Sequence, residues 1–451
     1  MVTSASRRRT RTRTGRRTWS AARTQTRTHA QTAANPSSTA ETPGASPVQL
    51  RPLPGETGSF GLLRLVLLQI AAALLVAGWI VGPTALAPAS VVAVVLVLFA
   101  VVRRRGRPLH EWLDTARALR SRRRGAAERS IPPGTDPAFA PAVECDPALR
   151  TYAYSGRERR QVGLVGDGTF VTAVLQVESD VTALRADRGR QPLPVNLVRD
   201  ALEVDGIRLE SAQIVLHTQP APALHLPQQS LAVTNYAPLQ ALTGAPAVRI
   251  TWIALKLDPR LSAEAVAARG GGLIGAQKCV VRAADQLASR LTGAGFHVTV
   301  LNEEEVASAI ATSACANPLV TAEANRATAP ERRTEESPRT WRCDNRRHTT
   351  YWVKRWPQLG GSGGAALPQL VALLTAVPAL TTTFSLTLGR GARQDIAVRG
   401  HVRVTGRGDA ELVAARRSLE QAARQAGTAL VRLDREQLPG MLATLPLGGA
   451  R

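Results

Sequence analysis

Two apolar runs near the start of the chain constrain its fold more than any other feature of the sequence. Residues 62–81 contain a single charged side chain, Arg64, and residues 84–102 contain none. A helix of about 20 apolar residues spans the roughly 30 Å hydrocarbon core of a bilayer. Because only two residues separate the runs, they predict a two-helix transmembrane hairpin within residues 58–102, and hence a membrane-anchored protein.

Arginines on either side of the runs indicate an orientation. Residues 1–57 carry ten arginines against two acidic residues, and residues 103–129 carry ten against three. An even number of spans leaves both flanks on the same side, and basic flanks favour the cytoplasm. The sequence therefore predicts a protein of the inner (plasma) membrane with two spans and both termini in the cytoplasm.

The basic charge of the chain lies mostly in these flanks. The formal net charge is +23, and clustered arginines can bind either nucleic-acid phosphates or anionic lipid headgroups. Because the excess adjoins the predicted spans, we expect anionic headgroups as partners and no nucleic acid. The candidate contacts are Arg103, Arg104 and Arg105.

Composition divides the rest of the chain into four further regions. Residues 1–57, rich in Arg and Thr, are predicted to be a disordered basic tail because they hold little apolar surface to bury. Residues 103–129 are predicted to form a basic amphipathic helix, and residues 130–142 a linker. A cytosolic domain is then expected over residues 143–451.

The predicted helix after the spans has one apolar side. The apolar residues recur at spacings of three or four, with arginines on the remaining faces, and they are Leu109, Trp112, Leu113, Ala116 and Leu119. This pattern is typical of a helix in the headgroup region. Docking of the same side onto a partner helix explains the pattern equally well, so both interpretations stay open.

The cytosolic domain alternates strand-like and helix-like segments. Such alternation predicts an α/β or α+β domain with a mixed sheet, and the aperiodic segment 316–339 is a plausible division into two lobes. Strands are predicted at residues 161–165, 169–177, 212–217, 248–257, 296–301, 348–354, 381–388, 395–404 and 430–433. Helices are predicted at residues 193–204, 262–291, 303–314, 367–376 and 409–425.

No catalytic motif can be assembled from the sequence. The four cysteines form no CxxC pair, no glycine-rich phosphate loop is present, and there is no Asp-x-Asp pair of the kind that holds a metal and a diphosphate. We therefore expect no catalytic, cofactor-binding or metal-binding residues and no cofactor.

An aromatic cluster stands out because aromatic residues make up only 4% of the chain. Tyr351, Trp352 and Trp356 lie close together, with Trp341 shortly before them. Along a strand, Tyr351 and Trp352 point to opposite faces. Exposed Trp and Tyr often anchor protein interfaces, so both core packing and an interface remain open for this cluster.

Several short motifs resemble the EccE component of actinobacterial type VII secretion systems. They are Thr57-Gly58-Ser59, Gly106-Arg107-Pro108-Leu109, Glu111-Trp112-Leu113, Tyr351-Trp352-Val353 and Trp356-Pro357. The resemblance implies a structural subunit of a membrane secretion complex beside EccB, EccC, EccD and the mycosin protease. It also implies a cytosolic fold similar to a degenerate glycosyltransferase.

Two functions therefore compete. The favoured one is a non-enzymatic structural subunit that stabilises the secretion complex through its hairpin and cytosolic domain. The alternative is a membrane-anchored, glycosyltransferase-like enzyme that acts on a nucleotide-linked or lipid-linked substrate. The missing Asp-x-Asp pair weakens the alternative without excluding metal-independent chemistry.

Overall fold

The computed structural model describes most of the chain after the N-terminal tail. The predicted tail 1–57 lies outside the described residues. The described ranges are 59–101, 103–104, 107–128, 131–132, 134–156, 160–179, 192–220, 248–326, 331–357, 367–391 and 395–449, with residues 231, 234, 235, 238 and 246.

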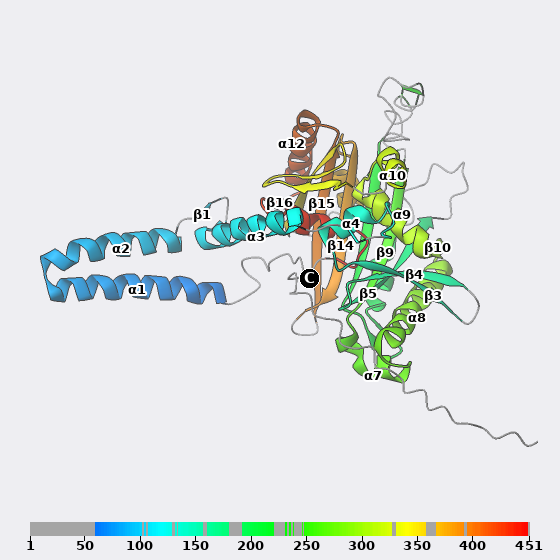
Figure 1. The fold of residues 1–451 in the computed structure, drawn as a ribbon, viewed down its shortest axis with the longest axis horizontal. Coiled ribbons are helices and arrows are strands. Elements are labelled where there is room, and N and C mark those ends of the chain that lie inside the picture. Colours follow the sequence, from blue (N-terminus) through cyan, green and yellow to red (C-terminus); the bar gives the residue numbers. More distant parts are fainter. Residues whose placement is uncertain are drawn as a thin grey trace, which may run out of the picture. The chain divides into compact units, whose positions relative to one another are not determined.

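A twelve-stranded sheet forms the centre of the described chain (Figure 1). Its main path runs through β11 (Thr334–Glu336), β12 (Trp341–Cys343), β13 (Arg346–Arg355), β15 (Ile396–Gly406), β14 (Thr381–Arg390), β8 (Ser211–Gln219), β9 (Val248–Leu257), β5 (Val171–Ser179), β4 (Gln161–Gly166) and β3 (Arg150–Ser155). Off this path, β10 (Phe296–Val300) pairs with β5, and β16 (Ala429–Arg432) pairs with β13.

Every pairing between the described strands of this sheet is antiparallel. The prediction of a mixed sheet of α/β or glycosyltransferase-like type is therefore wrong, and the described domain is α+β. Helices between strands suggested parallel crossovers, but a chain can also pass over a helix and return antiparallel. The predicted division at residues 316–339 stays a prediction, although strands before and after it belong to this one sheet.

Helices cover both faces of the sheet. The first face, called here the helix face, packs Leu255, Leu386 and their neighbours against the largest helices in one apolar core. The helices on this face are α5 (Val195–Asp200), α7 (Ala263–Ala268), α8 (Gly272–Gly293), α11 (Leu367–Thr375) and α12 (Asp409–Gln425). The opposite face carries a second core under α4 (Ala140–Cys145), α9 (Glu303–Ala314) and α13 (Gln437–Leu442).

Short elements complete the described fold. Two small sheets have two strands each. One consists of β1 (Arg103–Arg104) and β2 (Arg107–Pro108), and the other of β6 (Glu203–Val204) and β7 (Ile207–Arg208). A 3-10 turn η1 (Pro259–Ser262) precedes α7, and α10 (Pro318–Ala324) follows α9.

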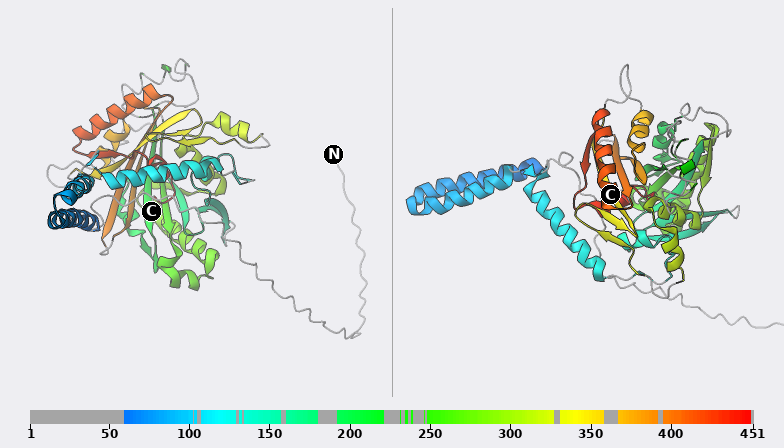
Figure 2. Two further views of the ribbon diagram at one scale, coloured as in Figure 1. Left: turned by 60° about the vertical axis from the view of Figure 1, so that its left-hand side comes forward. Right: turned by 90° about the horizontal axis from the view of Figure 1, so that it is seen from above.

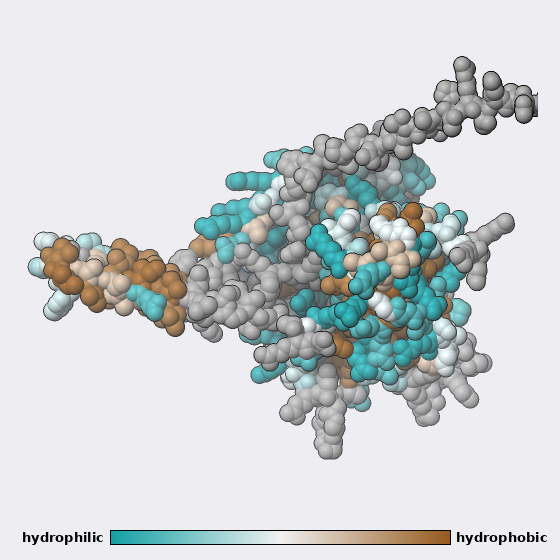
Figure 3. Space-filling view, turned by 90° about the horizontal axis from the view of Figure 1, so that it is seen from below, coloured by the Kyte–Doolittle hydropathy of each residue, from teal (hydrophilic) through white to brown (hydrophobic). Residues whose placement is uncertain are grey.

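The two apolar runs form consecutive helices, α1 (Ser59–Val81) and α2 (Pro83–Val101), which pack against each other. Figure 3 shows apolar residues gathered along this pair, and Trp79 is 77% exposed. In the part of the chain that the structure describes, no helix is both long enough and apolar enough to cross a membrane. This finding contradicts the predicted membrane-anchored class with transmembrane spans at residues 62–81 and 84–102.

The sheet face opposite the helix face is largely polar and yet buried. Along β8, β14 and β15, apolar side chains mostly alternate with polar ones, so the two kinds point to opposite faces of the sheet. Such a side of an antiparallel sheet often faces water, but here each of its central residues is less than 9% exposed. The polar face, as we call it, comprises Thr172, Ser211, Gln213, His217, Lys256, Thr381, Thr383, Ser385, Thr387, His401, Arg403 and Thr405.

Residues 437–449, called here the C-terminal segment, cover the polar face and are buried throughout. Side chains of the strands bind the backbone of this segment. Ser385 Oγ and Gln213 Nε2 each donate to the Ala443 carbonyl at 2.9 Å, and the Gly448 N–H donates to Gln213 Oε1 at 2.8 Å. Further donors are Ser211 Oγ to Gly448 O at 2.6 Å and Thr172 Oγ1 to Leu447 O at 3.0 Å.

Gly448 tests how closely the segment approaches the sheet. Its φ is +92°, and a Cβ atom built there would lie 2.4 Å from Lys256 Cβ. Gly168 has a similar φ of +88°, but no atom lies within 4 Å of its would-be Cβ. We expect Gly168→Ala to cost about 1 kcal/mol of unfolding free energy, and Gly448→Ala about 1–3 kcal/mol more. Urea unfolding of both variants measures this, and equal losses would contradict the close packing.

Candidate functional site

Helix α3 (Leu109–Glu128) packs one side against the sheet domain. The left view of Figure 2 shows α3, in cyan, lying across that domain. Leu119 and Thr115 are each 5% exposed, and Trp112 is half-buried. These positions are three or four residues apart and therefore share a helix face. The apolar side of α3 is thus used for contact within the chain.

A buried ion pair fixes the same side of α3. Arg122 Nε lies 2.9 Å from Glu336 Oε2, and its Nη2 lies 3.0 Å from Oε1. The side chain of Glu336 is 3% exposed and that of Arg122 is 18% exposed. Such a two-pronged arginine–carboxylate contact fixes orientation as well as position. Glu336, on β11, also accepts the Leu438 N–H at 3.0 Å.

A second contact joins α3 to the residues just before the C-terminal segment. The Arg435 guanidinium lies 3.9 Å from the centroid of the Trp112 ring, a cation–π contact. Arg122 Nη2 also donates to the Arg435 carbonyl at 2.6 Å. We call Trp112, Arg122, Glu336 and Arg435 the α3 latch. It connects α3, β11 and the start of the C-terminal segment.

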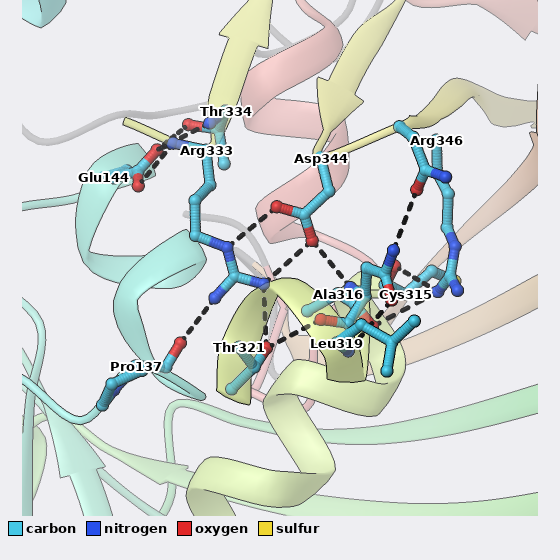
Figure 4. Close-up of polar contacts among 12 residues, drawn as sticks. Pro137, Glu144, Cys315, Ala316, Leu319, Thr321, Arg333, Thr334, Asp344 and Arg346 are labelled. Carbon is cyan, nitrogen blue, oxygen red and sulfur yellow. Dashed lines mark hydrogen bonds and ion pairs between the residues drawn. The ribbon is translucent and has the colours of Figure 1, made fainter. Parts of the chain in front are cut away.

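A buried network of charges surrounds the strand β11 that carries Glu336 (Figure 4). Arg333 pairs with Asp344 through two contacts of 2.8 Å and donates to the Pro137 carbonyl at 2.7 Å. Glu144 of α4 accepts the backbone N–H groups of Arg333 and Thr334 at 2.9 and 2.7 Å. Because the charges are paired and hydrogen-bonded, this network can hold β11 rigidly in place.

The residues predicted as a membrane or partner interface differ in how far the structure describes them and in how exposed they are. Arg105 lies outside the described residues. Arg103 and Arg104 form β1 and Leu109 begins α3, but their side chains are not among those described. Leu113 is half-buried beside Trp112, and Leu119 is buried against the chain itself. Their contact with lipid or with a partner stays a prediction.

The aromatic cluster divides between the core and the surface. Tyr351 is 1% exposed on the helix face, and its hydroxyl donates to Glu420 at 2.7 Å. Burial, followed by that carboxylate, raises the pKa of Tyr351. Trp356 packs against the helix-face core, while Trp352 is half-buried. An interface role for these three residues also stays a prediction.

Two buried arginines on the sheet lie at the C-terminal end of α9. Arg346 Nη1 donates to the Cys315 carbonyl at 2.7 Å, and Arg403 Nη2 donates to the Ser313 carbonyl. Both side chains are nearly inaccessible, and burial lowers the pKa of Arg403. The negative end of a helix dipole favours cations. The carbonyl end of α9 therefore compensates charges that have no carboxylate partner among the described contacts.

Buried histidines flank Arg403 on the polar face. His217 Nδ1 lies 3.0 Å from Thr383 Oγ1, and His348 Nδ1 lies 2.9 Å from Thr405 Oγ1. Burial, assisted by Arg403, lowers the pKa of His217 to about 3 and that of His348 well below its usual value. Burial also lowers the pKa of His401 to about 4. These rings are therefore neutral at ordinary pH, and those of His217 and His348 serve as hydrogen-bonding core residues.

The described residues offer little for catalysis. Among them, no group of three His, Cys, Asp or Glu side chains could hold a metal ion. Cys145, Cys279, Cys315 and Cys343 are all buried and reduced, and burial raises the pKa of Cys343 well above its usual value. A thiol of that kind is a poor nucleophile.

The sequence analysis missed Glu336 and Arg435 and assigned Arg122 no role within the chain. One signal was available for Arg122, because it lies three residues after Leu119 and so on the apolar side of the helix. No local pattern marks Glu336 as its partner, since 214 residues separate the two.

The buried histidines make stability depend on pH. A histidine whose pKa is lowered by folding stabilises the fold fully above its unfolded pKa of about 6.5, and that stability falls as the pH drops below this value. At pH 5.5 each of the three costs about 1.4 kcal/mol, so we expect a loss of about 4 kcal/mol relative to pH 7.5. Urea unfolding at the two pH values measures this loss.

Variants assign the pH effect to particular histidines. His217→Gln should reduce the loss by about a third, because glutamine cannot titrate. His297→Gln, at an exposed position on β10, should leave the loss unchanged. Equal pH sensitivity of the wild type and His217→Gln would show that the buried ring is not responsible.

Comparison with known proteins relates one segment of the chain to a family. Residues 245–353 match the family described as "Putative type VII ESX secretion system translocon, EccE". The match covers β9 through most of β13 and includes Arg333, Glu336 and Asp344. No curated protein matches the chain at a significant level.

The family match and the short motifs point to the same identity, and the resemblance to EccE is confirmed. The matched segment contains β11, to which α3 is fixed through Glu336. Segment 245–353 is thus similar to the EccE family of type VII secretion components.

Proposed function

We propose that this protein is a non-enzymatic structural subunit of the type VII secretion complex and that α3 is its structural link. The observation that carries this proposal is the buried Arg122–Glu336 pair. It fixes α3 to the sheet domain through Glu336, which lies inside the matched segment 245–353. Through this pair, a position imposed on α3 by the complex is transmitted to the whole sheet domain. The family's partners, EccB, EccC, EccD and the mycosin protease, are the components that we expect around it.

The strength of the link follows from its burial. Removing one partner of a buried ion pair leaves an uncompensated charge and commonly costs about 3–5 kcal/mol. Arg122 keeps some solvent contact, so we expect roughly 2–4 kcal/mol here. An exposed pair such as Arg117–Asp114, at 3.5 Å, contributes at most about 1 kcal/mol. The contrast makes Arg122 the decisive arginine of α3.

The outer side of α3 suits an anionic surface. Arg117, Arg120 and Arg124 are exposed and lie three and four residues apart, on one face away from Trp112. We place this arginine stripe against anionic lipid headgroups at the inner membrane, where each basic residue contributes about 1 kcal/mol. In this proposal the arginine stripe holds the protein at a membrane surface by electrostatic attraction.

The glycosyltransferase-like alternative has no comparable support. It rested on a mixed α/β sheet, which the antiparallel pairing contradicts. None of the contacts on the described polar face forms a nucleophile, base and orienting residue. We therefore do not carry this alternative further.

Assembly tests the structural role. Arg122→Gln should weaken co-migration of the protein with the secretion components on a native gel, because α3 loses its fixed position. Arg123→Gln is the matched control, because Arg123 is exposed on the same helix and lies outside the arginine stripe. If Arg122→Gln co-migrates as fully as Arg123→Gln, α3 does not act as the link.

Vesicle flotation tests the arginine stripe. Replacing Arg117, Arg120 and Arg124 with Gln should lower affinity for vesicles containing phosphatidylglycerol about a hundredfold, from about 1 kcal/mol for each residue. Binding should also weaken with added salt.

The matched control variant for flotation replaces Arg160, Arg282 and Arg342, which are exposed elsewhere on the domain, and it should bind like the wild type. Vesicles of phosphatidylcholine alone should bind none of the proteins strongly. Equal losses in both triple variants would show that net charge, and not the position on α3, decides the binding.

A further inference from the structure

The C-terminal segment is bound in the way that a peptide ligand is bound. Polar side chains from β5, β8 and β14 contact its backbone at Ala443, Leu447 and Gly448. Ser313 of α9 adds a bond to the Thr444 carbonyl at 3.1 Å. Hydrogen bonds to the backbone of a peptide select its shape. Contacts to its side chains would select its sequence. Leucines of the segment enter the second core.

The polar face can exist without this cover. Most of its side chains are Ser, Thr, Gln, His, Lys and Arg, which can exchange their present partners for water, and only a few apolar residues of the second core, among them Val215 and Trp252, lie between them. An antiparallel sheet with one solvated polar side is common. The helix face could not open in the same way, because it carries a continuous apolar core.

The α3 latch holds the beginning of the C-terminal segment. Glu336 binds the Leu438 N–H, and Arg122 binds both Glu336 and the Arg435 carbonyl. Arg435 has a φ of +67°, which is uncommon for a residue other than glycine. Its side chain lies over Trp112, and its N–H donates to the Pro338 carbonyl at 2.6 Å. Contacts with α3 therefore stabilise the turn that leads into the segment.

We propose that the polar face is a peptide-binding groove, that the C-terminal segment is its resident ligand, and that the α3 latch keeps the groove occupied. The ligand class is an apolar peptide that forms one short helix followed by turns, as α13 and residues 443–448 do, with glycine at the position of Gly448, where a Cβ atom would meet Lys256. The proposal rests on contacts within the chain and is independent of the secretion complex. Movement of α3 opens the groove.

Hydrogen exchange on the purified full chain tests the latch. The double variant Trp112→Ala with Arg122→Gln should accelerate amide exchange of residues 437–449 about tenfold or more, since charge-assisted hydrogen bonds and a cation–π contact are lost. Amides in β8 and β9 should keep their wild-type rates. Arg123→Gln is the control and should change neither region, because Arg123 is exposed and belongs neither to the α3 latch nor to the arginine stripe.

Two exchange results would overturn the proposal. One is an unchanged rate in residues 437–449 of the double variant, which would mean that α3 does not hold the segment. The other is equal acceleration in β8, β9 and the segment, which would mean general destabilisation.

Peptide binding tests the groove directly. A fluorescent peptide with the sequence of residues 437–449 should bind the double variant and bind the wild type at least tenfold more weakly. The same peptide with alanine in place of Gly448 should bind the double variant at least tenfold more weakly than the unaltered peptide. Failure of the unaltered peptide to bind the double variant, or equal binding of the two peptides, would refute the groove.

Discussion

The cover of residues 437–449 over the polar side of the sheet is the constraint on which the rest of the structure depends. With it in place, Arg403, Lys256 and three histidines are buried on one surface of the sheet. Burying such groups is unfavourable unless each finds a partner. The end of α9 supplies a partner for Arg403, Glu210 one for Lys256, and the hydroxyls of Thr383 and Thr405 supply partners for two of the histidines. The interior is therefore stable as a connected polar assembly beside an ordinary apolar core.

Helix α9 contributes to this assembly at both of its ends. Asn302 and Glu305 form a capping box at its start, where three acidic residues also lie. At its other end, Arg346 and Arg403 bind its last carbonyls. The helix thus carries complementary charge along its whole dipole, and it couples the polar face to the network around Arg333. The α3 latch also connects α3 to this assembly, through Glu336 on β11.

Local features of the sequence were predicted well, and distant pairings were not. The helices at residues 303–314 and 409–425 have the predicted bounds, and β4 and β5 lie within two residues of the strands predicted at 161–165 and 169–177. These signals lie within a few residues of one another. The antiparallel order of the sheet was missed because strand direction depends on how the chain returns over a helix. Polar and apolar residues alternate in β14, but no local pattern shows that a segment 58 positions away covers the polar side.

The order of synthesis gives the covering segment one more consequence. Residues 437–449 follow all twelve strands in the sequence, so the polar side stays uncovered while those strands are being made. The bond between Thr172 and Leu447 joins positions 275 residues apart. Contacts at such separation form late and slowly, because a long loop must close first. A nascent chain of this protein can therefore complete its apolar core well before its polar interior closes.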